Sequence, residues 1–332
     1  MHDENDSALT DALLTHHAGA IIRNRKASAV DYRPNVWTMK ALIEAPDSQG
    51  STALKRAVGR LTVSYGYEKA NIQCLIKHGA DINERDHLGA TVLHHLCKGG
   101  PSRVSSIFLI GLGADVRAVD NEGRTPLHYA AIACRKGPDA LVEILPVRGA
   151  DPDAQDNAGQ SPLHCAAASL GYRSTWVTSE LIRSQANVHL LDKQGRTALH
   201  LAAASPNDEF EKTSMTLIRA GIDLNIADQS GSTALHYAAH RRSGSRLVAL
   251  LLLRGAEVSV IDRSGAMPAY YAAAAGDWRS INVLKHKAAK SGLNEMQSQI
   301  AAGLVARRAI KRRTEDGADT ARRNSAETEK TT

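Results

Sequence analysis

The chain has 332 residues, of which 43% are hydrophobic and 23% are charged, and its formal net charge at pH 7 is +6. That charge is uneven, because residues 285–332 carry a net +5 and leave about +1 for everything before them. A nearly neutral body has no global field for nucleic acid, so direct nucleic-acid binding is not expected. The longest apolar run, Leu247 to Leu253, is too short to cross a bilayer, so no membrane association is expected either.

Residues 1–46 are expected to form an N-terminal tail that ends in a capping helix. The first residues are polar and acidic, unlike a secretory signal peptide with its basic start and apolar centre. Trp37, Met39, Leu42 and Ile43 supply apolar side chains for a helix that could cover the first repeat. The four cysteines of the chain form no CxxC pair, which favours buried thiols in a reducing compartment, cytoplasmic or nuclear.

One short phrase recurs five times in the middle of the chain. Each copy reads Thr or Ser, then Val, Pro or Ala, then Leu and His, and the copies begin at Thr91, Thr125, Ser161, Thr197 and Thr233. Successive histidines of the phrase are separated by 34, 36, 36 and 36 residues. Recurrence at this period predicts one supersecondary unit per repeat, which buries its apolar face by stacking on its neighbours.

Each unit reads as a turn followed by two helices. An Asp-x-x-Gly step precedes the phrase, and Thr or Ser then stands at a helix N-cap, with Pro126 and Pro162 at the first helical position. A second apolar helix follows and ends in Gly-Ala-Asp or a variant, where Gly suits a left-handed C-terminal cap. Pro146 breaks the pattern of one second helix and is expected to kink it.

The turn, the T-P-L-H-x-A phrase, the paired helices and Gly-Ala-Asp together resemble the ankyrin repeat over residues 47–290. The resemblance implies an all-α solenoid, an ankyrin repeat array of helix-turn-helix units joined by β-hairpin loops. Five good repeats would be flanked by degenerate ones, since Lys55 replaces the first His and the last phrase reads Met267-Pro268-Ala269-Tyr270. The array is also similar to fungal ankyrin repeat proteins, a group that includes regulators associated with secondary-metabolite pathways.

Length varies only in the turn between the paired helices. From the His to the terminal Gly position the repeats span 19, 21, 21, 21 and 19 residues, while each gap to the next His is 15. Insertions on one face often mark a binding face, and aromatic and Arg side chains dominate interface energetics. Candidate partner contacts in these turns are Tyr172, Trp176, Phe210, Arg241 and Arg242. The alternative is that these turns are tolerated insertions with solvated charges.

Residues 291–332 are expected to form a basic helix, from about Asn294 to Arg313, followed by a disordered tail. Its apolar residues Ile300, Ala301, Leu304 and Val305 are expected to dock on the last repeat. The cations of this helix form a candidate nuclear-localisation signal that comprises Arg307, Arg308, Lys311, Arg312 and Arg313. The alternative is that they are the solvated end of the helix.

The residue pattern does not indicate catalysis. His94, His128, His164, His200 and His236 occupy one slot in successive repeats, whereas a catalytic residue is needed once. The resemblance implies that each imidazole bridges the Thr or Ser hydroxyl and the neighbouring hairpin backbone. The sequence has no phosphate-binding loop, nucleophile elbow or convincing metal-ligand spacing. We therefore expect no enzyme activity, cofactor, bound metal or small-molecule substrate.

Two functions are compatible with this reading. The leading hypothesis is a monomeric, non-enzymatic adaptor or scaffold whose groove, lined by the connecting loops and first helices, binds another protein. The alternative is a nuclear or transcription-associated regulator, for instance of a fungal secondary-metabolite pathway, which uses the basic C-terminal segment for localisation. Cytoplasmic or nuclear location distinguishes the two.

Overall fold

The computed structural model describes residues 43, 52–61, 67–99, 103–133, 141–171, 173–206, 209–290 and 296–309. They belong to two compact units, Met1–Asn187 and Val188–Thr332. Every regular element in these described ranges is a helix. None of the described helices is long and apolar enough to span a membrane.

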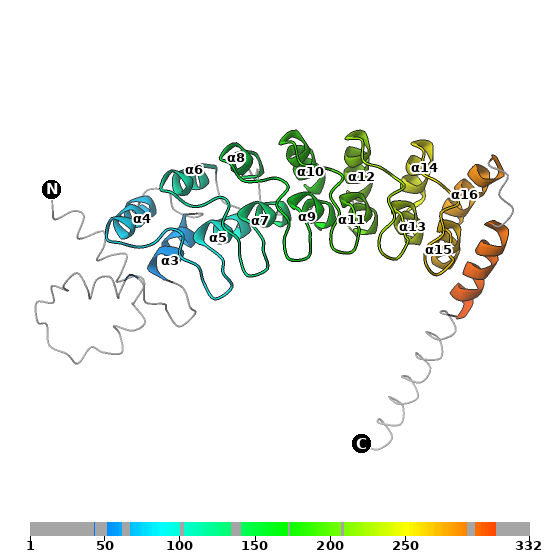
Figure 1. Ribbon diagram of the computed structural model, residues 1–332, viewed down its shortest axis with the longest axis horizontal. Helices are drawn as coiled ribbons and strands as arrows, with labels where there is room; N and C mark the ends of the chain where they lie inside the picture. The colour runs from blue at the N-terminus through cyan, green and yellow to red at the C-terminus, as the bar shows by residue number, and fades with distance from the viewer. Residues whose placement is uncertain are drawn as a thin grey trace, which may run out of the picture. The chain divides into compact units, whose positions relative to one another are not determined.

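The N-terminal unit is built from pairs of helices. The pairs are α3 (Ala53–Arg60) with α4 (Tyr67–Lys77), α5 (Val92–Gly99) with α6 (Arg103–Gly111), α7 (Pro126–Ile132) with α8 (Leu141–Val147), and α9 (Pro162–Ala168) with α10 (Ser174–Arg183). The first helices α3, α5, α7 and α9 pack side by side in one row, and the second helices lie in another (Figure 1). Each repeat therefore contacts mainly its neighbours, as expected for a solenoid.

The C-terminal unit continues the same scheme within itself. Its pairs are α11 (Ala198–Ala204) with α12 (Phe210–Arg219), α13 (Ala234–His240) with α14 (Ser245–Leu253), and α15 (Pro268–Ala275) with α16 (Trp278–Lys290). A last helix covers residues 296–309 and is drawn in orange beside α15 and α16 in Figure 1. The all-helical repeat architecture expected from the sequence is thus confirmed in both units.

The connecting loops differ from the expectation of β-hairpins. Each loop, called a finger here, joins the second helix of one repeat to the first helix of the next, and none of the described fingers contains a strand. The finger Asp closes the turn instead, because the Asp120 carboxylate accepts the backbone N–H groups of Glu122 and Arg124 at 2.8 and 2.9 Å. A side chain therefore takes the backbone donors that a β-ladder would have paired.

Neighbouring fingers are joined by backbone and amide hydrogen bonds. The Asn121 backbone N–H donates to the Leu88 carbonyl at 2.9 Å, and the Asn157 side-chain amide donates to the Asn121 carbonyl, also at 2.9 Å. In the C-terminal unit, the Gln229 amide donates to the Lys193 carbonyl at 2.8 Å. The fingers of each unit therefore form a connected edge without forming a sheet.

The core of each unit is filled by the leucines of the repeated phrase. They are at most 1% exposed, and they are Leu93, Leu127 and Leu163 in the N-terminal unit and Leu199 and Leu235 in the C-terminal unit. Alanine pairs follow them, such as Ala130 and Ala131, which are also buried. Small side chains at these positions let adjacent first helices approach closely. The register inferred from the phrase is therefore correct.

In four of the five phrases the histidine connects its helix to the next finger. At His128, Nδ1 accepts the Thr125 backbone N–H at 3.1 Å and lies 2.9 Å from the Thr125 hydroxyl, in a reciprocal capping box. Since Nδ1 is an acceptor, the ring proton is on Nε2, which donates to the Gln160 carbonyl at 2.9 Å. The bridging role implied by the resemblance is confirmed here.

The same Nε2 bond recurs in other repeats. It joins His94 to the Arg124 carbonyl at 3.0 Å, and His200 and His236 to the carbonyls of Ser232 and Ala266, both at 3.2 Å. Burial lowers the pKa of these three imidazoles and of His128, although the carbonyl each one binds favours protonation. The bridges are therefore built from neutral rings.

The helix over residues 296–309 docks on the last repeat, but not through the whole expected face. Met296 and Ile300 are buried, whereas Ala301 is exposed and Val305 is 64% exposed. Gly303 sets this orientation, because a Cβ there would lie 2.3 Å from the Tyr270 carbonyl oxygen. The prediction was therefore right for Ile300 and wrong for Ala301 and Val305.

Gln299 on this helix replaces a missing bridge. Tyr270 occupies the histidine slot of the degenerate last repeat, so α15 (Pro268–Ala275) has no imidazole cap. The Gln299 carbonyl oxygen accepts the Met267 backbone N–H at 3.3 Å, and its amide donates to the Gly265 carbonyl at 2.9 Å. The docked helix thus completes the N-terminus of the helix it covers.

Several expectations fall on residues the structure does not describe. The N-terminal tail up to residue 42, Cys134 and the tail from residue 310 onward lie outside the described residues. Cys74, Cys97 and Cys165 are buried thiols, in agreement with the expectation. Pro146, expected to kink its helix, is the penultimate residue of α8, so it removes a backbone donor only in the last turn.

A single exception at the helix C-cap leads to a stability prediction. Two residues beyond the end of the second helices α4, α6, α8, α12 and α14, φ is positive and the residue is a glycine: Gly79, Gly113, Gly149, Gly221 and Gly255. After α10 the same position holds Gln185, with φ 67°. A side chain in this conformation costs about 1 kcal/mol. Gln185→Gly should therefore raise the free energy of unfolding in urea by up to about 1 kcal/mol.

Gly113→Gln is the converse variant, because it places a side chain where φ is positive. A Cβ built there has no atom within 4 Å, so the side chain meets no steric clash. It should lower the free energy of unfolding by a similar amount, since it adds only the backbone cost. A loss of stability in Gln185→Gly would show that the Gln185 side chain makes a contact worth more than the strain it imposes.

The neutral histidines predict a fall in stability at mildly acidic pH. Their pKa lies below the unfolded value of about 6.5, so the unfolded chain binds more protons as the pH falls from about 6.5. The contribution of the neutral imidazoles to the free energy of unfolding is complete above that pH. It is lost as the pH falls toward the pKa that the histidines have in the folded chain. Urea unfolding measured from pH 7 downward should show a decreasing free energy of unfolding.

His128→Gln is the control, because Gln at this helix position can keep the capping bond without titrating. The variant should show a shallower dependence on pH in the same range. The finger carboxylates affect stability only at lower pH, because hydrogen bonds outweigh burial and lower their pKa below the usual value. These carboxylates are Asp86, Asp192, Asp228 and Asp262. Equal slopes for both proteins would contradict the role assigned to the imidazole.

Candidate functional site

The lengthened turns were expected to carry the partner contacts. In the N-terminal unit Trp176 lies on α10 with a half-buried ring, and the Arg173 guanidinium carbon is 4.6 Å from its centre. Tyr172, beside them in the sequence, lies outside the described residues. Trp176 therefore stacks with a cation and keeps part of its side chain exposed to solvent.

The C-terminal unit uses two of the candidates to hold a turn in place. Phe210 is 7% exposed, and the guanidinium carbon of Arg241 lies 3.9 Å from the centre of its ring. Arg241 also donates a hydrogen bond to the Ser205 carbonyl. Phe210 and Arg241 thus brace neighbouring turns against each other, while Arg242 is exposed. Residue type and spacing could not distinguish the packed pair Phe210 and Arg241 from the exposed Arg242. The stacking of Arg241 on Phe210 depends on which repeat the turn packs against.

The candidate localisation residues are also divided by the structure. Arg307 is half-buried, and its guanidinium fills the space beside Gly276, at the left-handed C-cap of α15. Arg308 is exposed, and Lys311, Arg312 and Arg313 lie outside the described residues. Arg307 therefore contributes to docking the last helix, next to a helix C-terminus that favours positive charge.

The groove side of the N-terminal unit contains a hollow of about 600 Å³. Its lining comes from α5, α7, α9 and the segments beside them, and comprises Lys98, Arg124, Tyr129, Ile132, Ala133, Gln160, Cys165, Ala168, Ser169 and Leu170. We call it the N-terminal hollow. It lies along the row of first helices, on the side where the sequence analysis placed the groove.

Two large apolar side chains are left open in this hollow. Ile132 is 43% exposed and Leu170 is 56% exposed. Lys98 is exposed beside them, and Arg124 forms ion pairs with Glu122 at 2.6 Å and Asp156 at 3.6 Å. Open apolar surface rimmed by charge is typical of a site for a protein partner.

Two titratable side chains of the N-terminal hollow, Tyr129 and Cys165, are held in their neutral forms. The Tyr129 hydroxyl donates to the Asp120 carboxylate at 2.8 Å, and burial together with this bond raises the pKa of Tyr129 to about 12. Burial raises the pKa of the Cys165 thiol to about 12 as well. Both groups are neutral at physiological pH, so neither is an activated nucleophile or base.

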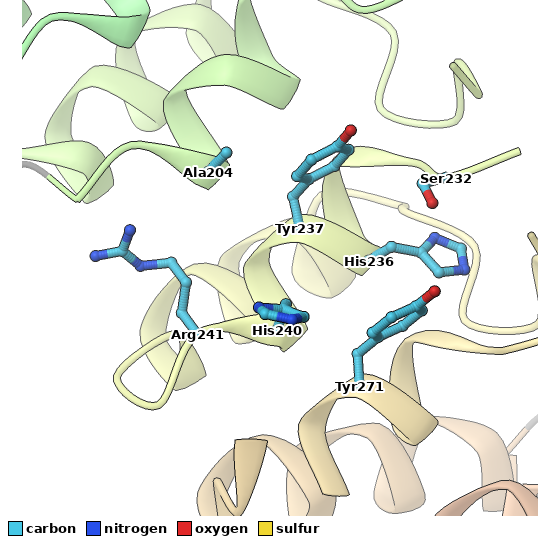
Figure 2. Close-up of a pocket in the computed structure, with 7 residues that line it drawn as sticks. All are labelled: Ala204, Ser232, His236, Tyr237, His240, Arg241 and Tyr271. Atoms are coloured by element: carbon cyan, nitrogen blue, oxygen red, sulfur yellow. The ribbon is translucent and has the colours of Figure 1, made fainter. Parts of the chain in front are cut away.

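The C-terminal unit has a smaller hollow, of about 300 Å³. Figure 2 shows its lining residues, which are Ala204, Ser232, His236, Tyr237, His240, Arg241 and Tyr271. Tyr237 from α13 and Tyr271 from α15 lie on opposite sides, and their hydroxyls donate to Asp228 and Asp262 at 2.7 and 2.5 Å. Burial and the bond to Asp228 raise the pKa of Tyr237 to about 12.

Sequence reasoning missed the slot that lines both hollows. This slot directly follows the phrase histidine, or Tyr270 in the last repeat, and it holds Tyr129, Tyr237 and Tyr271, whose hydroxyls donate to the finger Asp. In two other repeats it holds Cys165 and Leu201. In one repeat His95 replaces the tyrosine and lies 2.6 Å from Asp86. The sequence contained a signal for this slot, because tyrosine follows the histidine in two of the five phrases.

The described residues contain no group of three or more His, Cys, Asp or Glu that could hold a metal ion. The phrase histidines are engaged in capping, and the finger carboxylates accept hydrogen bonds from their own turns. What these residues offer chemically is shape, apolar surface and charge.

Comparisons with known proteins agree with this geometry. A family of ankyrin repeats in three copies matches residues 60–133 and 131–213, and the single ankyrin repeat matches residues 230–263. Human protein phosphatase 1 regulatory subunit 27 is 33% identical over 111 residues, which cover 32% of this chain and 56% of that protein. Mouse NF-kappa-B inhibitor delta is 41% identical over 63 residues, 19% of either chain.

Human BCL-6 corepressor-like protein 1 is 37% identical over 83 residues, which are 25% of this chain and 4% of that protein. The chain thus matches between 4% and 56% of the length of these relatives. The family match is broader, since it covers more than half of this chain. The chain belongs to the ankyrin repeat family.

Proposed function

We propose that the protein is a non-enzymatic adaptor that binds another protein in the groove along its first helices. The observation that carries this proposal is the N-terminal hollow, where Ile132 and Leu170 stay open to solvent between charged side chains. Burial of two such side chains by a partner would remove apolar surface from water at a well-supported site. Interface backbones move little in most pre-organised complexes, so we expect the surrounding helices to present this surface without rearrangement.

The relatives support the same class of function. Their names describe a regulatory subunit of a phosphatase, an inhibitor and a corepressor-like protein, which are roles exercised on other proteins. The neutral tyrosine and thiol of the hollow support the absence of catalysis. We propose a monomer that needs no cofactor and takes no small-molecule substrate.

The groove proposal predicts which substitutions remove the partner. Ile132→Glu combined with Leu170→Glu places two carboxylates in the hollow, where a bound partner would have to desolvate them. In affinity capture from the native cell, quantified by mass spectrometry, partner recovery should fall at least about tenfold. Both side chains are partly exposed already, so the fold should be retained.

Val104→Glu combined with Val147→Glu is the matched control. These residues are 52% and 83% exposed on the second helices α6 and α8 of the same unit. The control should capture the partner as the unchanged chain does. If the control loses the partner and the groove variant keeps it, the binding face is the row of second helices.

The lengthened turns stay a candidate second contact region. Trp176→Ala with Arg242→Ala tests them, because the structure leaves both side chains at least partly exposed. A partner lost from this variant and kept by the groove variant would place the site on the turns.

A second candidate function is a nuclear or transcription-associated regulator. The names of the corepressor-like relative and the NF-kappa-B inhibitor support it, and Arg308 is exposed on the last helix. A role in a fungal secondary-metabolite pathway stays a prediction from resemblance. Both candidate functions use the same groove and differ in where the protein acts.

Localisation predicts a clear difference between the two. Arg308→Gln, Lys311→Gln, Arg312→Gln and Arg313→Gln in one variant remove the candidate signal and leave Arg307 in its docking position. If the segment directs import, a fluorescent fusion of the variant should lose its nuclear excess, because receptors recognise such clusters by charge. Unchanged distribution of the variant would reject the localisation role and leave the cytoplasmic adaptor.

A further inference from the structure

The last repeat and the helix over residues 296–309 differ in charge from the rest of the chain. Residues 263–290 and 296–309 contain seven Lys or Arg and one Asp. That Asp, Asp277, is buried at the start of α16, where it accepts the Arg279 backbone N–H at 3.1 Å and the Ser280 hydroxyl at 2.6 Å. These two ranges therefore present cations to solvent without any exposed carboxylate.

An exposed tryptophan stands among these cations. Trp278 is 56% exposed at the first position of α16, and Arg279 beside it is exposed too. The exposed stripe of α16 continues to Lys285, seven residues or two helical turns further on. Tryptophan is costly to leave in water and is enriched at the centres of protein interfaces.

The docked helix carries two more cations, and one of them lies near the start of α16. The Arg307 guanidinium lies against Gly276, two residues before Trp278, and Arg308 follows it in an exposed position. Gly303 against Tyr270, and Gln299 bonded to Met267 and Gly265, fix this helix on the repeat. The fold therefore holds the last helix against the segment that precedes α16, and we call Trp278, Arg279, Lys285, Arg307 and Arg308 the end surface.

We propose that the end surface is a second docking site, independent of the groove, for an acidic protein segment that places an apolar side chain against Trp278. Charge complementarity identifies the partner, because five described residues supply four cations and one large apolar ring. A polyanion without apolar groups would use the cations and leave the indole in water. Nucleic-acid surfaces combine several aromatic side chains with a longer basic track, which a single tryptophan does not provide.

The test uses the full chain and a short fluorescein-labelled peptide of glutamates with two central leucines, measured by fluorescence anisotropy. The peptide should bind, and its affinity should weaken as salt is added, because screening reduces attraction between exposed charges. Trp278→Ala should weaken binding about tenfold, as for an anchor residue of an interface. Arg279→Gln with Arg308→Gln should weaken it and reduce its dependence on salt.

Arg242→Gln with Arg246→Gln is the matched control. Both arginines are exposed in the same unit, and the variant changes the net charge by the same amount. It should leave peptide affinity within about twofold of the unchanged chain. Melting temperatures equal to that of the unchanged chain would show that Trp278→Ala retains the fold.

Three results would overturn the proposal. No measurable binding of the glutamate peptide would do so, and so would equal losses in the control and the Arg279→Gln, Arg308→Gln variant, which would indicate general charge attraction. Tighter binding of short duplex DNA, unaffected by Trp278→Ala, would make the surface a nucleic-acid site. Because the groove residues are unchanged in every variant, none of these results bears on the adaptor proposal.

Discussion

The structure depends on one hydrogen-bonded bridge that recurs along the chain, from the N-cap of a first helix through an imidazole to the next finger. His128 shows the complete arrangement, with Nδ1 on the Thr125 cap and Nε2 on the Gln160 carbonyl. One side chain thereby starts its own helix and fixes the position of the following repeat. A solenoid has no long-range core to do this, so the coupling of neighbours has to be built into every repeat.

This bridge also determines what the groove contains. It fixes the orientation of the first helices that carry it, so that a tyrosine after the histidine reaches the finger Asp, as Tyr129 reaches Asp120. The N-terminal hollow then contains the neutral side chains of Tyr129 and Cys165, while Ile132, one turn after Tyr129, remains open. A surface of this kind suits recognition of a protein, because the scaffold supplies rigidity and the open positions supply chemistry.

The resemblance to the ankyrin repeat implied the histidine bridge. The sequence itself predicted the repeats and the helix pairs, because both follow from local rules that recur in phase. It did not predict contacts that depend on tertiary packing. Phe210 was expected at an interface and is covered by Arg241, and the fingers are closed by Asp side chains where hairpins were expected. The last helix docks through Gly303 rather than Val305, since close approach to a carbonyl cannot be read from apolar spacing.

The tautomer and protonation of the phrase histidines test the bridge most directly. They can be measured on the folded chain by nuclear magnetic resonance of nitrogen-15-labelled imidazoles, with the pH lowered from 7. If the bridge couples the repeats, His94, His128, His200 and His236 carry their proton on Nε2 and stay neutral below pH of about 6.5. Imidazoles that carry the proton on Nδ1, or that titrate at the unperturbed pKa while the chain stays folded, would contradict it.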